Sequence, residues 1–207
     1  MQRVAVDPVV PDVVLVRRAV RVLEEGGVVV FPTDTLYALA VDPRNRQAVE
    51  RLFCAKQRDP DVAVPLIASD LFQVEHEVGR LNEIGRRLAK KFWPGPLTLV
   101  VEASPGMVEG VRTGRTVAVR VADHPVAWML THEFGCAVTG TSANISGQLP
   151  ADHPDKLSAE LLANVDMLVD AGRTRGGLPS TIVDVTGLEP VLVRAGVVSW
   201  TRVLESL

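Results

Sequence analysis

The chain has 207 residues and a mass of 22.3 kDa, which is enough for one sizeable hydrophobic core and predicts a single domain over residues 1–207. Hydrophobic residues make up 47% of the sequence and charged residues 23%, a composition that excludes a disordered, fibrous or membrane-embedded chain. The net charge of -3 argues against a protein that coats nucleic acid, because neutralising phosphates requires an excess of basic residues on one face.

The first predicted element is an amphipathic helix over residues 12–25. Valine and leucine recur there at steps of three and four with charged residues between them, and two glycines follow. The β-branched run 28–31 comes next and ends at Pro32. Because this run does not alternate between apolar and polar residues, we expect a strand that is covered on both faces.

Short apolar runs and helical patterns then alternate along the chain and predict an α/β fold, with helices packed against an open, twisted sheet. The close spacing of strands around 97–121 and 181–194 predicts antiparallel pairs, so we expect a mixed parallel and antiparallel sheet. The predicted strands are 64–68, 97–102, 117–121, 136–139, 167–170, 181–185 and 191–194, and the predicted helices are 45–56, 70–90, 125–134 and 155–164.

Polar residues follow the first predicted strand in the run Pro32-Thr33-Asp34-Thr35-Leu36-Tyr37. In open α/β sheets, ligands bind beyond the carboxyl ends of strands. Two hydroxyls and a carboxylate in this position could hold an ammonium and a carboxylate group. The alternative is that Thr33 or Asp34 caps a turn or the next helix.

Two cations, Lys56 and Arg58, stand at the exit of the helix predicted over 45–56. In an extended segment their side chains would point to the same side, and Pro60 favours an extended backbone just downstream of them. A lysine point charge beside a planar arginine fork suits the separate oxygens of a polyphosphate. A solvated surface pair is the alternative, and spacing alone favours it.

The stretch 139–147 leaves an apolar strand with short polar residues, two glycines and no charge. Such a loop offers hydroxyls, an amide and backbone N–H groups to an anion or a base. A turn-rich surface loop is the alternative. A hydrolase nucleophile elbow fits at Gly140 and Ser142 but not at Asn144, which occupies the position of its second glycine.

Arg120 and Arg194 each end an otherwise apolar strand. A buried or half-buried guanidinium requires a partner, which is either an internal carboxylate or a ligand. Ser180, directly before the strand predicted at 181–185, is a weaker polar candidate.

Neither cysteine stands in a Cys-x-x-Cys pair, so we expect Cys54 and Cys136 to be buried free thiols. The histidines match no metal motif, and we expect surface positions for all of them: His76, His124, His132 and His153. The sequence contains neither common phosphate-binding glycine loop. The start of the chain lacks the features of a leader, and no apolar run approaches about 18 residues, so we expect a cytoplasmic protein.

Taken in order, several motifs together resemble the YrdC-like threonylcarbamoyl-AMP synthase family over roughly residues 12–197. The joined Lys-x-Arg and Ser-x-Asn signatures are characteristic of the synthases in this family. The motifs are Pro32-Thr33-Asp34-Thr35-x-Tyr37, Lys56-x-Arg58, Trp93-Pro94-Gly95-Pro96-Leu97-Thr98, Arg120-Val121, Ser142-Ala143-Asn144-x-Ser146-Gly147, Pro179-Ser180-Thr181-Ile182-Val183-Asp184 and Arg194-x-Gly196.

The resemblance implies a concave, positively lined cavity that binds ATP, L-threonine and bicarbonate. Threonine would be held by Thr35, Arg120 and Ser180. The residues implied for ATP are Lys56 and Arg58 on the phosphates, Ser142 and Asn144 on the nucleotide and its phosphates, and Arg194 on the nucleotide.

The implied chemistry is carbamate formation on the threonine amine, followed by attack of the carbamate on the α-phosphorus with loss of pyrophosphate. Alignment and charge neutralisation would carry the catalysis, with Mg²⁺ bridging the phosphates. The product would pass to a threonylcarbamoyl transferase complex that modifies tRNA, and direct contact with tRNA is left open.

The chain departs from the family pattern near the implied threonine site. Ala38 and Ala40 replace usual glycines, and Asp59 and Ala122 replace usual prolines. Because an added Cβ can restrict a ligand's approach, the two glycine changes bear on specificity more than on fold.

Two alternatives remain open from the sequence. One is a paralogue of the same fold that acts on another carbamoyl-nucleotide or in the hydrolytic direction, although the presence of both signatures speaks against it. The other is a non-catalytic RNA-binding or ribosome-maturation module, which would show salt-sensitive RNA affinity and no ATP turnover.

Overall fold

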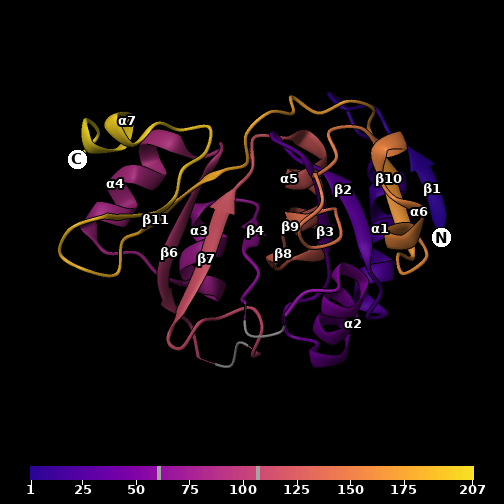
Figure 1. Ribbon diagram of the computed structural model, residues 1–207, viewed down its shortest axis with the longest axis horizontal. Helices are drawn as coiled ribbons and strands as arrows, with labels where there is room; N and C mark the ends of the chain where they lie inside the picture. The colour runs from indigo at the N-terminus through magenta and orange to yellow at the C-terminus, as the bar shows by residue number, and fades with distance from the viewer. Residues whose placement is uncertain (60–61, 106–107) are drawn as a thin grey trace.

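The computed structural model describes residues 1–59, 62–105 and 108–207. Its strands lie in two mixed sheets with helices on their outer faces (Figure 1). The first sheet has the order β1 (Gln2–Ala5), β10 (Met167–Asp170), β2 (Val29–Pro32), β3 (Tyr37–Ala40) and β9 (Thr141–Ser142). The second has the order β12 (Val191–Arg194), β11 (Thr181–Asp184), β6 (Leu97–Ala103), β7 (Thr116–Val121), β4 (Leu66–Ala68) and β8 (Val138–Thr139), with β5 (Gly79–Arg80) paired to β6.

This arrangement confirms the mixed α/β fold. It also confirms the two predicted antiparallel pairs, which are β6 with β7 and β11 with β12. The strands are divided between two sheets instead of forming the expected single one. Strand pairing depends on contacts between distant parts of the chain, which the local sequence pattern does not encode.

The longer helices begin at residues whose side chains accept a backbone N–H from the first turn. These caps are Asp12 for α1 (Val13–Glu24), Asn45 for α2 (Arg46–Lys56), Asn82 for α4 (Glu83–Phe92) and His124 for α5 (Pro125–Phe134). Short side chains with an acceptor satisfy N–H groups that lack a partner inside the helix. The short helices are α3 (Leu71–Gln73), a π-helical turn (Val74–Val78), a 3₁₀ turn (Pro154–Lys156), α6 (Ala159–Leu162) and α7 (Trp200–Leu204).

Two clusters of buried side chains hold the sheets and helices together. The first includes Leu39, Leu66 and Leu97, and so joins both sheets. The second packs α1 and α5 on the first sheet. Strand β2 is buried along its whole length and contributes to both clusters, which confirms that the run 28–31 is covered on both faces.

The predicted helix over 70–90 is wrong, because β5 divides it. Gly79 lies so close to β6 that a Cβ on it would stand 2.1 Å from the carbonyl oxygen of Glu102, and Asn82 then caps a new helix. The predicted helix over 155–164 is likewise divided into the 3₁₀ turn and α6.

Other expectations are corrected by burial. Cys136 is buried as expected, whereas Cys54 is exposed, and both are free thiols. His76 and His132 are exposed, but His124 and His153 are partly buried caps of helical turns. In the described part of the chain, none of the helices has both the length and the apolar character needed to cross a membrane.

Several connections pass from one sheet to the other and bring distant residues together. The chain goes from β8 to β9 through Gly140, and the segment 171–180 runs from β10 across the molecule to β11 (Figure 1). Gly140 is required at its crossing, since a Cβ there would lie 2.5 Å from the side chain of Ile67. These crossings border the cavity described next.

Candidate functional site

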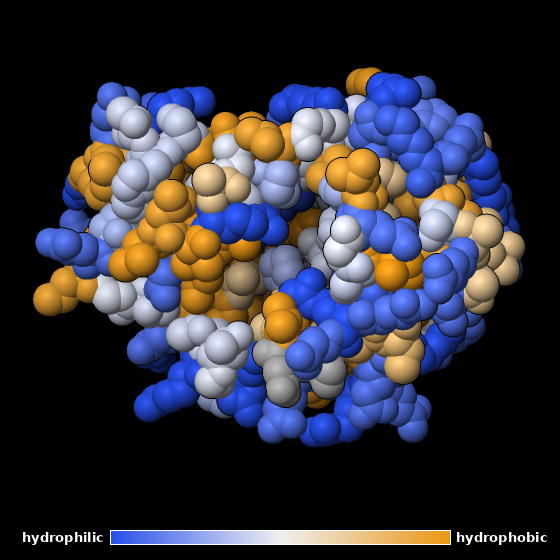
Figure 2. Space-filling view, viewed as in Figure 1, coloured by the Kyte–Doolittle hydropathy of each residue, from blue (hydrophilic) through white to orange (hydrophobic). Residues whose placement is uncertain are grey.

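A cavity of about 290 Å³ opens where the two sheets meet. Figure 2 shows this face of the molecule hollowed between its two halves, with hydrophobic side chains gathered on one flank. Its polar lining consists of hydroxyls and guanidinium groups. The sequence-predicted residues that line the cavity are Thr35, Arg58, Arg120, Ser142, Ser180 and Arg194.

Arg120 reaches the cavity from β7 and is paired with a buried carboxylate. Its Nη1 donates to Asp34 Oδ1, and the side chains of Arg120 and Asp34 are 6% and 0% exposed. The Nη2 lies 3.4 Å from the hydroxyl oxygen of Thr35. The internal carboxylate foreseen for a buried arginine is therefore Asp34, and Arg120 still lines the cavity.

The turn between β2 and β3 is shaped by Thr33. The hydroxyl oxygen of Thr33 accepts the N–H groups of Thr35 and Leu36 and donates to the carbonyl of Leu36 at 2.7 Å. It also lies 3.1 Å from the hydroxyl of Thr35. Thr33 therefore shapes the turn, as the alternative from the sequence foresaw, and both threonines also line the cavity.

Ser180 and Arg194 form a second polar group on β11 and β12. The Nη2 of Arg194 donates to the carbonyl of Ser180 at 2.7 Å and lies 3.2 Å from its hydroxyl oxygen. That hydroxyl also hydrogen-bonds with the hydroxyl of Thr98 on β6, at 2.8 Å. No carboxylate pairs with Arg194 in the described residues, so this guanidinium has its charge available to a ligand.

Lys56 lies behind the cavity wall. It is the last residue of α2 and is fully buried, which excludes a solvated surface pair. Its Nζ donates to the carbonyls of Ser142 and Asn144, at 2.5 and 2.7 Å. The ammonium therefore holds the loop whose Ser142 faces the cavity, and Asn144 lies in the same cluster with its Oδ1 accepting from the Ser142 hydroxyl.

Arg58 reaches the cavity because the chain turns sharply after Lys56. Gln57 has φ 48°, in the left-handed region, and ends α2. Arg58 then donates from Nε and Nη2 to the carbonyls of Val62 and Ala63, at 2.9 and 3.0 Å. These bonds fix the direction of a guanidinium that would otherwise be mobile.

The site is electropositive although the whole chain is acidic. Burial, and then the Arg58 guanidinium, lower the pKa of Lys56 to about 7. Burial also lowers the pKa of Arg58 and of Arg194. Since concentrated positive charge in a partly dry cavity favours bound anions, a polyanionic ligand suits this lining.

The lining does not fit a resident divalent metal ion. Among the described residues, no carboxylate lines the cavity, and no group of three or more His, Cys, Asp or Glu side chains is arranged to hold a metal. Hydroxyls and guanidinium groups are poor ligands for Mg²⁺, which prefers carboxylates, phosphates and water.

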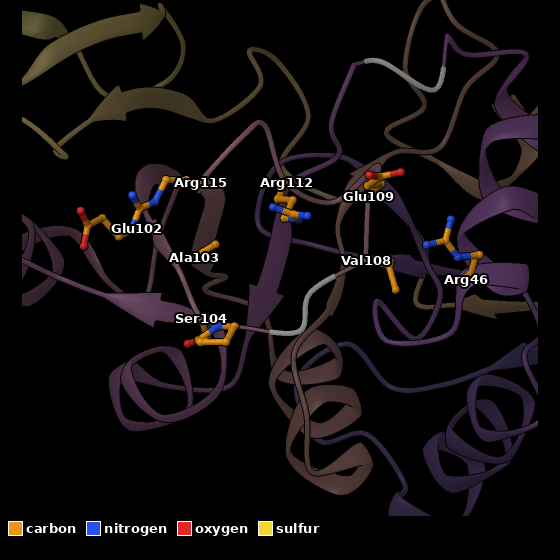
Figure 3. A pocket seen from close by; sticks show the side chains of 9 residues that line it. Arg46, Glu102, Ala103, Ser104, Val108, Glu109, Arg112 and Arg115 are labelled. Carbon is orange, nitrogen blue, oxygen red and sulfur yellow. The ribbon is translucent and has the colours of Figure 1, made fainter.

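A larger cavity, of about 490 Å³, lies elsewhere and has a different character. Figure 3 shows its charged side chains, which are those of Arg46, Arg112 and Arg115 together with Glu102 and Glu109. The opposite charges offset each other, and none of the predicted site residues is present. We therefore assign the functional site to the smaller cavity.

Some cavity residues received no role from the sequence. Thr98 and Thr141 line the cavity from the two sheets; Thr98 is a hydroxyl within a largely apolar strand, and Thr141 belongs to the polar loop 139–147 without a role of its own there. Of the two alanines that replace usual glycines, Ala38 lines the cavity and Ala40 is fully buried in the second cluster. Of these two replacements, only the one at Ala38 therefore places a methyl group in the wall of the cavity.

Comparisons with known proteins point to one family. The Sua5/YciO/YrdC family model, described as telomere recombination, matches residues 21–196. A threonylcarbamoyl-AMP synthase of Bacillus subtilis is 34% identical over 183 residues, which are 87% of this chain and 53% of that protein. A putative threonylcarbamoyl-AMP synthase of Mycobacterium tuberculosis is 36% identical over 190 residues, which are 91% of this chain and 87% of that protein.

A solved structure gives the same picture. The crystal structure of Pyrococcus abyssi Sua5 complexed with L-threonine superposes with a TM-score of 0.94 at 31% identity, over 100% of this chain and 61% of that one. The chain thus spans about half of the Bacillus relative and somewhat more of the Pyrococcus structure, but most of the Mycobacterium relative.

Proposed function

Because the chain belongs to the Sua5/YciO/YrdC family, we propose that it is an L-threonylcarbamoyladenylate synthase, a nucleotidyltransferase that forms threonylcarbamoyl-AMP and pyrophosphate from L-threonine, bicarbonate and ATP. The observation that carries this proposal is the cavity in which Arg58, Arg120 and Arg194 converge with hydroxyls from both sheets. Such a lining suits one substrate with several phosphates and another with a carboxylate.

The phosphates of ATP belong at the end of the cavity formed by Arg58 and the loop 140–144. Arg58 would contact phosphate oxygens with the N–H groups that Val62 and Ala63 leave free, and Ser142 would turn its hydroxyl from Asn144 Oδ1 to a phosphate oxygen. Lys56 and Asn144 would act from behind, with the ammonium charge at the back of the loop. Arg194 would contact the nucleotide from β12.

Threonine belongs at the end formed by Thr35, Arg120 and Ser180. The guanidinium of Arg120 would bind the carboxylate, and the hydroxyls of Thr35 and Ser180 would bind the polar groups of the amino acid. Support comes from the relative crystallised with L-threonine, which superposes over the whole chain.

The reaction requires two bond-forming steps. Attack of the neutral threonine amine on bicarbonate forms the C–N bond of a carbamate with loss of water. Attack of a carbamate oxygen on the α-phosphorus then breaks the bond to the β-phosphate and releases pyrophosphate. The side chains would align the reactants and neutralise charge, and Mg²⁺ would arrive with the phosphates of ATP. The product would then serve a threonylcarbamoyl transferase complex that modifies tRNA.

Mass spectrometry of the products tests the proposal. Incubation with ATP, threonine, bicarbonate and Mg²⁺ should give threonylcarbamoyl-AMP and pyrophosphate, and omission of any one substrate should abolish both. Hydrolysis of a carbamoyl-nucleotide without synthesis would favour the paralogue. Salt-sensitive RNA binding without ATP turnover would favour the RNA-binding module.

Nucleotide binding is expected to take up a proton at pH 8. The pKa of Lys56 is about 7 in the free protein, so its amine is mostly neutral at that pH, and a nearby phosphate raises the pKa and favours the ammonium. Calorimetry of ATP binding in buffers of different ionisation enthalpy should therefore show net uptake that approaches one proton. The Lys56→Met variant should lose this uptake, whereas Lys90→Met, at an exposed site on α4, should retain it.

The same lowered pKa affects stability in the absence of nucleotide. Between about pH 7 and the ordinary lysine value of 10.5, the unfolded chain holds a proton that the folded chain has lost, so the free energy of unfolding should rise with pH. Unfolding by urea should show this rise in the wild type and less of it in Lys56→Met. Equal slopes in the two proteins would contradict the assignment of the low pKa to Lys56.

Threonine should be preferred over serine by about 10–200-fold in kcat/KM, which is the range for one methyl group in an apolar pocket. Leu66, Ala118 and Ile182 supply apolar lining, and the polar groups common to both amino acids cannot separate them. Pyrophosphate release with threonine, serine and glycine measures the preference. Equal activity with all three would contradict a threonine site.

A further inference from the structure

Asp34 is a buried carboxylate that pairs with Arg120, one of the cavity's cations. It lies in the turn between β2 and β3 of the first sheet, and its partner Arg120 lies on β7 of the second sheet. The ion pair therefore joins the two sheets beside the cavity. Asp34 is not among the residues that line the cavity, so it acts on a ligand only through Arg120.

Stability alone is a poor explanation for this pair. Removing two charges from water costs free energy that their attraction barely offsets, so apolar replacements of buried ion pairs are often as stable. The pair is also incompletely satisfied, since Asp34 Oδ2 is buried and has no hydrogen-bond partner in the described structure. A carboxylate that served only stability would be better placed to accept from both guanidinium nitrogens.

The geometry of the pair leaves Arg120 able to bind a ligand. Asp34 contacts Nη1 alone, and the Nη2 approaches the hydroxyl of Thr35 at 3.4 Å. A guanidinium has five N–H donors, so most of them are not used by the carboxylate. Burial lowers the pKa of the nearby His124, which favours the neutral imidazole and leaves Arg120 as the cation that pairs with Asp34.

We propose that Asp34 is a positioning residue: it holds Arg120 by one nitrogen, in the orientation that presents the remaining donors to the carboxylate of the amino-acid substrate. This inference rests on the proposed function, because it requires an amino acid at Arg120. It assigns to Asp34 an indirect role in substrate affinity in place of direct contact with an ammonium group.

Asp34→Asn tests the proposal in steady-state assays. The amide has nearly the same shape but no charge, so the guanidinium is held less firmly. The KM for threonine should rise about tenfold, because the amide oxygen accepts from Arg120 more weakly than a charged carboxylate does. The KM for ATP should change little, because Arg58 and the loop 140–144 are not in contact with Asp34. Asp34→Glu, which retains a carboxylate, should recover part of the threonine affinity.

The proposal requires that Asp34 affects the KM for threonine only through Arg120. A double-mutant cycle tests this requirement. Arg120→Gln should raise the KM for threonine, and adding Asp34→Asn on that background should raise it no further. If the single variant Asp34→Asn does not fold, the double variant still tests the proposal, because it carries no unpaired buried charge. A rise in the KM for ATP equal to that for threonine, an unchanged KM for threonine, or a further loss on the Arg120→Gln background would each overturn the proposal.

These experiments distinguish a failure of the proposed function from a failure of the role assigned to Asp34. Wild-type protein that forms no threonylcarbamoyl-AMP would refute the proposed function itself. Active wild-type protein whose Asp34→Asn variant keeps normal threonine kinetics would refute only the role of Asp34.

Discussion

Replacement of Arg58 by alanine is expected to lower kcat/KM for ATP by about 10²–10³-fold, the usual cost of removing one donor from a preorganised anion site. Arg58 lines the cavity and is anchored by the carbonyls of Val62 and Ala63. Arg58→Lys should recover only a small part of the loss, because an ammonium cannot engage two phosphate oxygens as a planar fork. Pyrophosphate release with ATP varied at saturating threonine and bicarbonate measures the effect.

Arg115→Ala is the matched control for this prediction. Arg115 is an exposed arginine in the larger cavity, so its loss removes the same charge from the chain without touching the proposed site. Its kinetics should match the wild type. Thermal unfolding of all three variants should shift by only a few degrees. Near-normal turnover in Arg58→Ala would remove this residue from the phosphate site.

The sequence pattern predicted the bounds of several elements well, whether they are buried like β10 or exposed like β12. The strands at 167–170 and 191–194 and the helix at 125–134 have the predicted bounds. Local composition was sufficient in these segments because a proline or a glycine stands at, or within two residues of, an end of each.

The strands that were missed depend on distant partners or lack a turn signal. Strand β1 pairs in parallel with β10, more than 160 residues away in the sequence. Strand β3 forms a hairpin with β2, but the connecting residues Thr33 to Leu36 contain no glycine or asparagine. Those positions carry the site's hydroxyls and carboxylate, so the usual hairpin chemistry is absent where the site is built.

Several residues that line the candidate cavity were named from the sequence, but their arrangement was not predictable from it. Lys56 appeared in the sequence as one of two exposed cations, whereas its ammonium is buried beneath the loop of Ser142 and Asn144. Asp34 appeared as a ligand group, whereas it pairs with Arg120 from the other sheet. Both differences arise from contacts across more than 80 residues of sequence, and periodicity reports only local neighbours.

Gly196→Ala is expected to cause the largest loss of stability among these substitutions, of about 3 kcal/mol. A Cβ at Gly196 would lie 2.3 Å from the carbonyl oxygen of Pro179 and 2.5 Å from backbone atoms of Ser180 and Thr181. Backbone cannot rotate away as a flexible side chain does, so the segment after β12 must separate from the start of β11. For a chain of this size, such a loss corresponds to a fall in Tm of roughly 6–12 °C, measurable by circular dichroism.

Gly187→Ala is the matched control, because it makes the same change in the β11–β12 connection, where the nearest atom to an added Cβ is the Glu189 carbonyl oxygen at 3.7 Å. Its Tm should match the wild type. In Gly196→Ala, the KM for both ATP and threonine should also rise, since the displaced backbone holds Ser180 against Arg194. A Tm within a degree or two of the wild type would mean that β11 and β12 can separate at little cost, and Ser180 and Arg194 would then not be a preorganised pair.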